Sequence, residues 1–315
     1  MLGQIEITPY HWAGFIAIVL VLLSLDLGVF HRQAHVIRFR EALAWTDVWF
    51  VLSLGFCGAL ARLRSRQEAL EFLTGYIIEL SLSMDNVFVM AVIFAYFGVP
   101  LAYQHRVLFW GILGALVMRG TMIGLGAALI DRFDWLLPAL GAILLFTGVK
   151  MIFLGDPAPD PNRNVALRLA RRLFPVTQEF QGQKFFSTLD GRTALTPLAL
   201  VLLMVETTDL VFAVDSIPAI FAVTKKPFIV FTSNVFAILG LRSLYFVLAG
   251  AIEYFRYLKV GLSLVLCFIG GKMVLGAWDI DIPVSISLAV VASVILTSIA
   301  FSIIVARREK GADRT

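Results

Sequence analysis

Charged residues are scarce in this sequence of 315 residues. Asp, Glu, Lys and Arg make up 15% of it, whereas they make up about a quarter of an average soluble domain. Hydrophobic residues make up 59%, and the mean hydropathy is +0.88. This composition excludes an ordinary soluble domain, because a single core could not bury so much apolar surface. It predicts a single transmembrane domain that covers residues 1–315 and is embedded in a lipid bilayer.

Cysteine and histidine are equally rare, with two and four residues. Cys57 and Cys267 each fall inside an apolar stretch, and no Cys-x-x-Cys pair occurs, so a disulfide framework is not expected. The four histidines lie in loops or at the expected ends of helices: His11, His31, His35 and His105. Thiolate and imidazole are the ligands that Zn²⁺ and Cu⁺ favour, so a buried site for these metals is disfavoured.

The apolar residues are grouped into blocks, most of which reach the roughly 20 residues that a helix needs to cross a bilayer. Lipid offers no partner to unpaired backbone groups, so each block is expected to be an α-helix. The stretch before the first block has no basic segment or cleavage site, which predicts a retained helix and not a signal peptide. The nine predicted spans, of which the second is the shortest, are 11–29, 45–61, 72–97, 107–130, 135–154, 198–222, 228–251, 258–277 and 284–306.

The basic residues are distributed unevenly between the two sides of these spans. With the N-terminus outside, sixteen Lys and Arg lie on the cytoplasmic side and six lie outside. This bias predicts an outer N-terminus and a cytoplasmic C-terminus, and it explains the net charge of +4 without any nucleic-acid partner. The long loop 155–197 is expected in the cytoplasm, with a basic amphipathic helix over 165–174. Three arginines on the outer side, Arg62, Arg64 and Arg66, depart from the rule.

The chain contains an internal repeat. Asp-Asn-Val-Phe at 85–88 recurs as Asp-Leu-Val-Phe at 209–212, and a mid-helix arginine, Arg119 or Arg242, follows each copy. Phe-Thr-Gly-Val-Lys-Met at 146–151 then recurs as Phe-Ile-Gly-Gly-Lys-Met at 268–273. Each copy, 72–154 and 198–277, holds three predicted helices, so the second copy would enter the membrane from the opposite side. Inverted repeats of this kind are typical of secondary transporters, whose sites lie at the repeat interface.

Ten charged residues fall inside the apolar blocks, and leaving a charge at the bilayer centre costs at least about 2.5–3.5 kcal/mol. They should therefore face the protein interior and largely pair with one another, although three lie near helix ends. The acidic members outnumber the basic members by two: Asp26, Glu79, Asp85, Glu206, Asp209 and Asp215 against Arg119, Lys150, Arg242 and Lys272. Such an excess suits one divalent cation.

Helical spacing places several of these groups together. Glu79, Ser83 and Asn86 fall at i, i+4 and i+7, which is one helical face. Glu206 and Asp209 lie at i and i+3, and Pro218 follows Asp215 closely. Because proline removes a backbone hydrogen bond, a broken helix is expected there, which would turn Asp215 and the carbonyl groups of residues 213 and 214 toward the site.

The predicted ligands are all oxygen atoms, which hard cations such as Mg²⁺, Ca²⁺ and Mn²⁺ prefer. Two alternatives remain for the carboxylates: structural ion pairing with the arginines, and neutralisation by a proton. The predicted ligand set is Glu79, Asp85, Asn86, Glu206, Asp209 and Asp215. A pathway or gating role is predicted for Asp26, Ser83, Thr208, Asn234, Arg119, Arg242, Lys150 and Lys272.

Three segments that contain these residues are long enough to indicate a family. ELSLSMDNVFV at 79–89, VETTDLVFAVDSIPAIFAVT at 205–224 and TSNVFAILGLRSLYF at 232–246 closely resemble the signatures of the TerC family of integral membrane proteins, in its Alx-type branch, and SLDLGVFHR at 24–32 also fits. The resemblance implies a bacterial inner-membrane protein of about nine spans, associated with manganese export and with tellurite resistance. It places the acidic motif positions of the family on the six predicted ligands.

Together, these patterns predict a secondary transporter that exports a divalent cation through an oxygen-lined site, and the family likeness favours Mn²⁺ as its substrate. The alternative is a non-transporting membrane scaffold, or a component of tellurite or envelope-stress resistance. An enzyme is not expected, because no nucleophile–base pair is visible, and no organic cofactor is implied. The sequence leaves open the metal selectivity, the direction and coupling of transport, the partner proteins and whether the chain forms a homo-oligomer.

Overall fold

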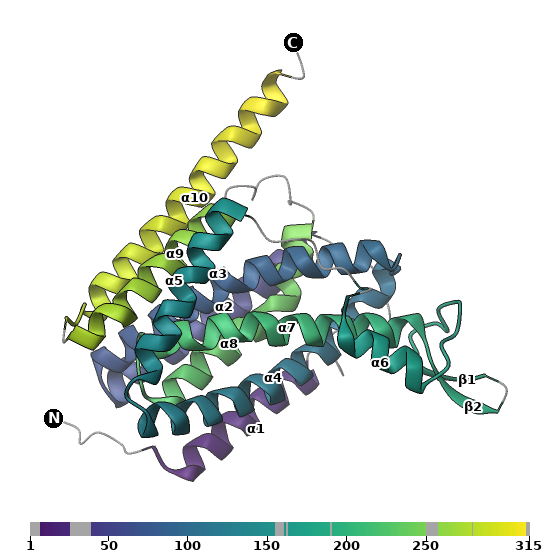
Figure 1. Cartoon of the computed structure of the whole chain (residues 1–315), viewed down its shortest axis with the longest axis horizontal. Helices are drawn as coiled ribbons and strands as arrows, with labels where there is room; N and C mark the ends of the chain where they lie inside the picture. The colour runs from purple at the N-terminus through teal and green to yellow at the C-terminus, as the bar shows by residue number, and fades with distance from the viewer. Residues whose placement is uncertain are drawn as a thin grey trace.

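A computed structural model describes residues 7–25, 39–154, 161, 163–189, 191–249, 258–278 and 280–312 (Figure 1). Within these ranges the chain is a bundle of α-helices with one small hairpin. The helices are α1 (Pro9–Leu25), α2 (Phe39–Leu63), α3 (Arg66–Tyr96), α4 (Leu101–Arg132), α5 (Leu136–Leu154), α6 (Val165–Leu173), α7 (Pro197–Phe221), α8 (Pro227–Ala249), α9 (Leu258–Leu275) and α10 (Val284–Ala312), and the hairpin pairs β1 (Phe186–Leu189) with β2 (Arg192–Leu195).

Among the described residues, eight helices are long and apolar enough to cross a membrane, namely α2, α3, α4, α5, α7, α8, α9 and α10. The all-α membrane fold predicted from the sequence is therefore confirmed. Helix α1 is apolar but has only 17 residues, which corresponds to about 25 Å of helix. The last part of the first predicted span, 26–29, lies outside the described residues.

Three local predictions are wrong. The predicted outer loop 62–71 is almost entirely helical, because α2 continues to Leu63 and α3 begins at Arg66, where Ser65 accepts a 3.1 Å hydrogen bond from the backbone N–H of Glu68 as its N-cap. The second span, expected to be the shortest, is a helix of 25 residues. Helix α7 is also continuous through Pro218 and is not broken there. Proline removes one backbone hydrogen bond, and the helix nevertheless continues for three residues beyond it, to Phe221.

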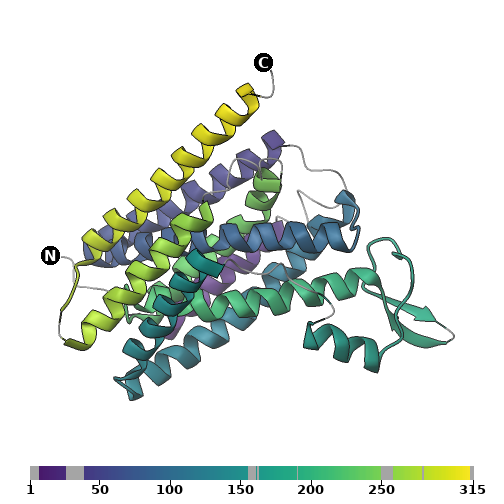
Figure 2. The same ribbon diagram turned by 45° about the horizontal axis from the view of Figure 1, so that its top comes forward.

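The helices of the two predicted repeats pack against one another reciprocally. Helix α3 contacts α8, α4 contacts α7, and α5 contacts α9. Figures 1 and 2 both show α5, α9 and α10 side by side on one flank of the bundle. Helix α6 and the hairpin project from another side of the bundle. This exchange of partners is the packing that an inverted repeat would produce, although the inverted symmetry itself stays a prediction.

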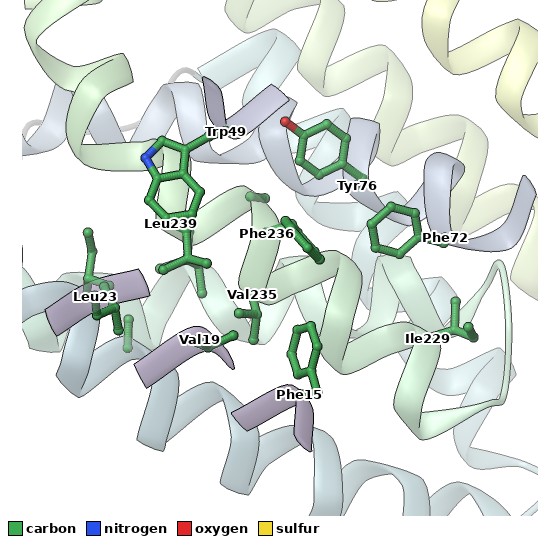
Figure 3. Packing of buried hydrophobic residues seen from close by; sticks show 14 of the residues in the cluster. Phe15, Val19, Leu23, Trp49, Phe72, Tyr76, Ile229, Val235, Phe236 and Leu239 are labelled. Carbon is green, nitrogen blue, oxygen red and sulfur yellow. The ribbon is translucent and has the colours of Figure 1, made fainter. Parts of the chain in front are cut away.

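A second flank is filled by aromatic and aliphatic side chains from α1, α2, α3, α4 and α8 (Figure 3). Phe15 of α1 and Trp49 of α2 meet Phe72 of α3 and Phe236 of α8, and all four are buried. The ring of Phe72 meets that of Phe236 edge to face at 5.8 Å, a geometry that aromatic pairs prefer. This cluster fixes α8, whose membrane-crossing segment is almost completely buried, in the middle of the bundle.

Two glycines at matched positions of the repeat explain the close approach of α5 and α9. A Cβ at Gly148 would lie 2.9 Å from the carbonyl oxygen of Ser263, and a Cβ at Gly270 would lie 2.7 Å from the carbonyl oxygen of Gly141. Only glycine allows the two backbones to meet at this distance. The recurring Phe-x-Gly-x-Lys-Met segments therefore carry a glycine because they form this helix–helix contact.

In the segment between the predicted repeats, α6 packs against α7. Helix α6, predicted over 165–174, is confirmed over Val165–Leu173, and its buried Leu167 faces the bundle. The hairpin was not predicted; it pairs Phe186 with Leu195 at its open end. Thr196 then caps α7, because its hydroxyl accepts from the backbone N–H of Ala199 at 3.3 Å and donates to the carbonyl of Lys184 at 2.7 Å.

Replacing Gly270 should separate α5 from α9. We expect Gly270→Val to lower the stability of the protein in detergent by about 1–3 kcal/mol, because the new side chain overlaps the backbone of α5. Gly271→Val is the matched control, since a Cβ at Gly271 meets no atom within 4 Å. Thermal unfolding of both variants checks the prediction, and equal midpoints for the two would contradict it.

Candidate cation site

Arg119 of α4 lies at the centre of the bundle with 1% of its side chain exposed. Its guanidinium forms ion pairs with Glu79 of α3 and with Asp209 of α7, and both carboxylates are themselves buried. The contact with Asp209 is bidentate, with Nη2 to Oδ1 at 2.7 Å and Nε to Oδ2 at 3.0 Å. Two parallel hydrogen bonds of this kind fix both the orientation of the two groups and the distance between them.

Polar side chains from α3, α7 and α8 complete the surroundings of this ion pair. The Nη1 of Arg119 lies 3.3 Å from the Ser216 hydroxyl and 3.5 Å from the Asn234 carbonyl oxygen. The amide of Asn86 donates to Asp209 at 3.4 Å. One guanidinium thus faces two carboxylates, so this cluster of side chains carries one excess negative charge. Removing one partner of such a buried pair costs about 3–5 kcal/mol, because it leaves an uncompensated charge in an apolar environment.

Several buried polar atoms around Arg119 have no hydrogen-bond partner among the described residues. Three are oxygens, namely Oε2 of Glu79, the hydroxyl of Ser83 and Oδ1 of Asn86, and the fourth is Nδ2 of Asn234. Buried polar groups are normally satisfied, so this concentration is unusual. The three oxygens come from one face of α3, as their i, i+4, i+7 spacing predicted. They are donor atoms of the kind that a hard cation takes.

Glu206 lies one turn before Asp209 on α7, and its carboxylate rests directly on α4 at Gly114. A Cβ at Gly114 would overlap that carboxylate, so only glycine leaves room for it. Glu206, Asp209 and Arg242 line the same small cavity, whose walls are otherwise apolar. The structure thus brings Glu206 next to the Arg119 cluster, and Arg242 of α8 lines the same cavity.

The remaining predicted residues lie in different surroundings. Asp85 and Asp215 are half-buried. The hydroxyl of Thr208 donates to the carbonyl of Met204 in its own helix at 2.7 Å. Lys272 donates to the Ser287 hydroxyl of α10 at 3.0 Å. Lys150 is exposed near the C-terminal end of α5, as its predicted place close to a helix end allows. Asp26 lies outside the described residues.

The six predicted ligands are therefore not gathered around one point in this conformation. Among the described residues, no group of three or more Asp, Glu, His or Cys side chains is arranged to hold a metal ion. Instead, the guanidinium of Arg119 lies between Glu79 and Asp209 and pairs with both. The structural ion pairing that the sequence left open as an alternative is present at these two residues.

Two residues of the cluster were missed by the sequence analysis. Ser216 contacts Arg119, and the only signal for it was its position two helical turns after Asp209 on the same face of α7. Gly114 gave no signal, because a glycine in an apolar helix is usually explained by helix packing.

Replacing Arg119 should destabilise the protein strongly. We expect Arg119→Gln to lower its stability by about 3–5 kcal/mol, because Glu79 and Asp209 lose their buried counter-charge. Adding Glu79→Gln to this variant should restore part of the loss. Lys150→Gln, which changes an exposed charge, is the control for the thermal unfolding measurement. An Arg119→Gln protein that unfolds like the Lys150→Gln protein would show that the ion pair is not needed for the fold.

Comparison with known proteins agrees with this architecture. Residues 64–310 match the model of the integral membrane protein TerC family. An uncharacterized membrane protein of Myxococcus xanthus is 51% identical over 97% of this chain and 96% of its own length. A Salmonella typhi protein named "Putative membrane-bound redox modulator Alx" is 48% identical over 91% and 92%, and an uncharacterized membrane protein of Rickettsia bellii is 41% identical over 93% and 97%. No solved structure matches the chain. The multi-pass membrane protein described above thus belongs to the TerC family, as its acidic segments predicted.

Proposed function

We propose that this protein is a secondary transporter that exports a divalent cation, with Mn²⁺ as its preferred substrate. The observation that carries the proposal is the pair of buried carboxylates, Glu79 and Asp209, held face to face by α3 and α7 in the centre of a membrane bundle. Ionisable groups at this depth are expensive, and they commonly line an ion pathway. The preference for Mn²⁺ over Mg²⁺ or Ca²⁺ rests on the family resemblance alone.

In this proposal, Arg119 and the transported cation compete for the same carboxylates. A transporter without its substrate must change conformation without leaving two buried acids unpaired. Arg119 supplies the counter-charge for that empty state. A divalent cation that reaches Glu79 and Asp209 displaces the guanidinium. The buried oxygens of Ser83 and Asn86, which have no hydrogen-bond partner among the described residues, lie on the same face of α3 as Glu79. They can then complete the coordination of the cation.

The remaining predicted ligands would join the site after a conformational change. Glu206 already lies beside Asp209 along the small cavity, whereas Asp85 and Asp215 would have to approach. We further propose that the two three-helix segments form an inverted repeat and move against each other, with the N-terminus outside and the C-terminus in the cytoplasm of a bacterial inner membrane. The reciprocal contacts of α3 with α8 and of α4 with α7 support this arrangement.

A redox, scaffold or tellurite-resistance role has less support among the described residues. The two cysteines are free thiols in different helix contacts: Cys57 donates to the carbonyl of Ala69 at 3.4 Å, and Cys267 packs against Gly148. Neither thiol lies in the polar cluster around Arg119. No observation therefore favours these roles over transport.

Everted membrane vesicles that contain the protein should accumulate Mn²⁺. Asp209→Asn and Asp85→Asn should each abolish this uptake, because each removes a charge that the cation needs as a ligand. Glu179→Gln, in the exposed part of the loop before the hairpin, is the matched carboxylate control and should transport normally. Uptake that is unchanged in both aspartate variants would refute the proposed ligands, and absence of Mn²⁺ uptake by the unaltered protein would refute manganese export.

A substitution that adds a methyl group next to Glu206 tests its role without changing its charge. Gly114→Ala should displace the Glu206 carboxylate and raise the Mn²⁺ concentration needed for half-maximal uptake. Gly111→Ala, one turn earlier on the same helix, is the control, because its Cβ would make an ordinary 3.5 Å contact with Val205. Both variants should fold, since the end of a flexible side chain can move. Equal concentration dependence in the two variants would exclude Glu206 from the site.

A further inference from the structure

A groove runs between α1, α2 and the beginning of α8. It encloses about 350 Å³, which is within the range of small-molecule sites. Its walls are almost entirely apolar. Phe15 of α1, Phe56 and Leu60 of α2, and Phe228 of α8 form its inner surface.

The groove opens on a surface of apolar side chains. Ile18 and Leu63, which line it, are 60% and 55% exposed in the protein. Helix α2 is long enough to cross the membrane, and α1 packs beside it in the same aromatic cluster. The open side of the groove therefore faces the hydrocarbon of the bilayer, where a lipid chain can enter it directly.

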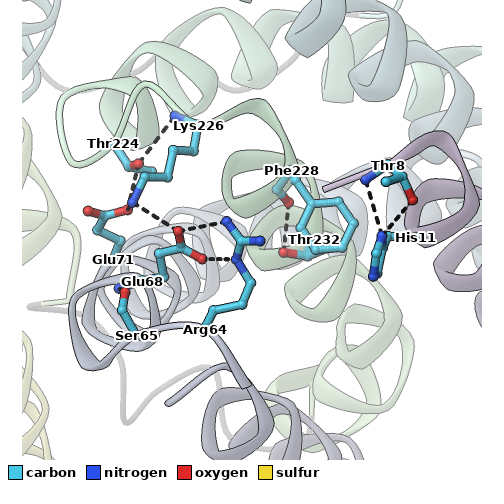
Figure 4. Close-up of polar contacts among 10 residues, drawn as sticks. All are labelled: Thr8, His11, Arg64, Ser65, Glu68, Glu71, Thr224, Lys226, Phe228 and Thr232. Atoms are coloured by element: carbon cyan, nitrogen blue, oxygen red, sulfur yellow. Dashed lines mark hydrogen bonds and ion pairs between the residues drawn. The ribbon is translucent and has the colours of Figure 1, made fainter. Parts of the chain in front are cut away.

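One end of the groove is polar and basic. Arg64 lines it, and the guanidinium of Arg64 pairs with Glu68, with Nη2 to Oε1 at 2.9 Å (Figure 4). Lys226 bridges Glu68 at 3.2 Å and Glu71 at 3.3 Å, and Thr224 donates to Glu71 at 2.8 Å. Both glutamates are buried, and their charges are balanced by Arg64 and Lys226 within this cluster.

The other basic residues of this end are not matched by these acids. Arg62 and Arg66 flank Arg64 at the turn between α2 and α3, and Lys225 precedes Lys226 at the turn between α7 and α8; all three are exposed. Glu68 and Glu71 balance the charges of Arg64 and Lys226. The three exposed basic residues therefore leave an excess of three positive charges at one end of an apolar groove. This arrangement also accounts for the basic residues that depart from the positive-inside rule.

We propose that this groove binds an anionic glycerophospholipid. One acyl chain lies along Phe15, Phe56 and Phe228, and the phosphate lies at the basic end near Arg62 and Arg66. An acyl chain matches the apolar walls, and a negatively charged headgroup matches the surplus charge; a zwitterionic lipid would match only the walls. The bound lipid links α1 and α2 to the turn that precedes α8, and so to the ion-paired end of α3.

The full chain, purified in mild detergent, tests this proposal by native mass spectrometry with equal amounts of dioleoyl phosphatidylglycerol and dioleoyl phosphatidylethanolamine. We expect phosphatidylglycerol to be retained preferentially. Gly14→Phe should weaken its binding roughly tenfold, because Gly14 lines the groove and a Cβ there meets no atom within 4 Å, so the ring fills the space of the chain. The double variant Arg62→Gln, Arg66→Gln should keep lipid binding but lose the preference for phosphatidylglycerol.

Gly55→Phe is the matched control, since Gly55 is also exposed on α2 and also meets no atom, but does not line the groove. Should Gly14→Phe not yield folded protein, Ala59→Phe fills the same groove from α2. Phosphatidylglycerol binding that is unchanged by a folded groove-filling variant would overturn the site, and equal retention of the two lipids by the unaltered protein would overturn the role of the charge. A change from dimer to monomer on filling the groove, with lipid binding unaffected, would overturn the proposal in favour of an interface between two copies.

Discussion

The buried guanidinium of Arg119 is the constraint on which the centre of this protein depends. A positive charge with 1% exposure is tolerable only if opposite charges reach it from neighbouring helices, and Glu79 and Asp209 do so from α3 and α7. Asn234 adds a contact from α8. Four long helices are thereby held in one register around a single side chain. The packing elsewhere, aromatic on the α1 side and glycine-mediated between α5 and α9, supports that arrangement.

The same ion pair gives the site its chemical character. Two acids face one base, and oxygen atoms that have no hydrogen-bond partner among the described residues lie beside them on one face of α3. A cluster built only for stability would be expected to balance its charges and to satisfy its polar atoms. This cluster does neither, and such local departures from stable design are characteristic of functional sites.

Much of the fold was predictable because hydropathy and repetition are strong signals. Apolar blocks identified the long helices, and the repeated segments identified Asp209 and Arg119, whereas the glycine contact of α5 with α9 became visible only in the structure. Hydropathy reports where a chain crosses lipid and not where a helix ends, so it missed the helical turns on both sides of Ser65. Proline chemistry suggested a break at Pro218, but a single lost bond near a helix end did not interrupt α7.

The arrangement within the site was harder to predict. Spacing placed Glu79, Ser83 and Asn86 on one face correctly, since it depends only on the geometry of one helix. It could not decide whether the carboxylates would face one another or an arginine, because that depends on how α3, α4 and α7 are rotated. Gly114 is the clearest example of what the sequence could not predict. A glycine is needed there because the carboxylate of Glu206, 92 residues later in the sequence, lies against it, and this contact is visible only once the helices are packed.

The ion pair of Arg119 also has a consequence for the order in which the chain is assembled in the membrane. Glu79 and Arg119 belong to α3 and α4, which emerge from the ribosome one after the other, so the first pair can neutralise itself as soon as both helices are inserted. Asp209 arrives much later, on α7, and finds its counter-charge only on a helix that is already in place. An α7 released into lipid alone would carry this acid without compensation. The order of the helices along the chain therefore places the counter-charge of Asp209 in the membrane before Asp209 itself.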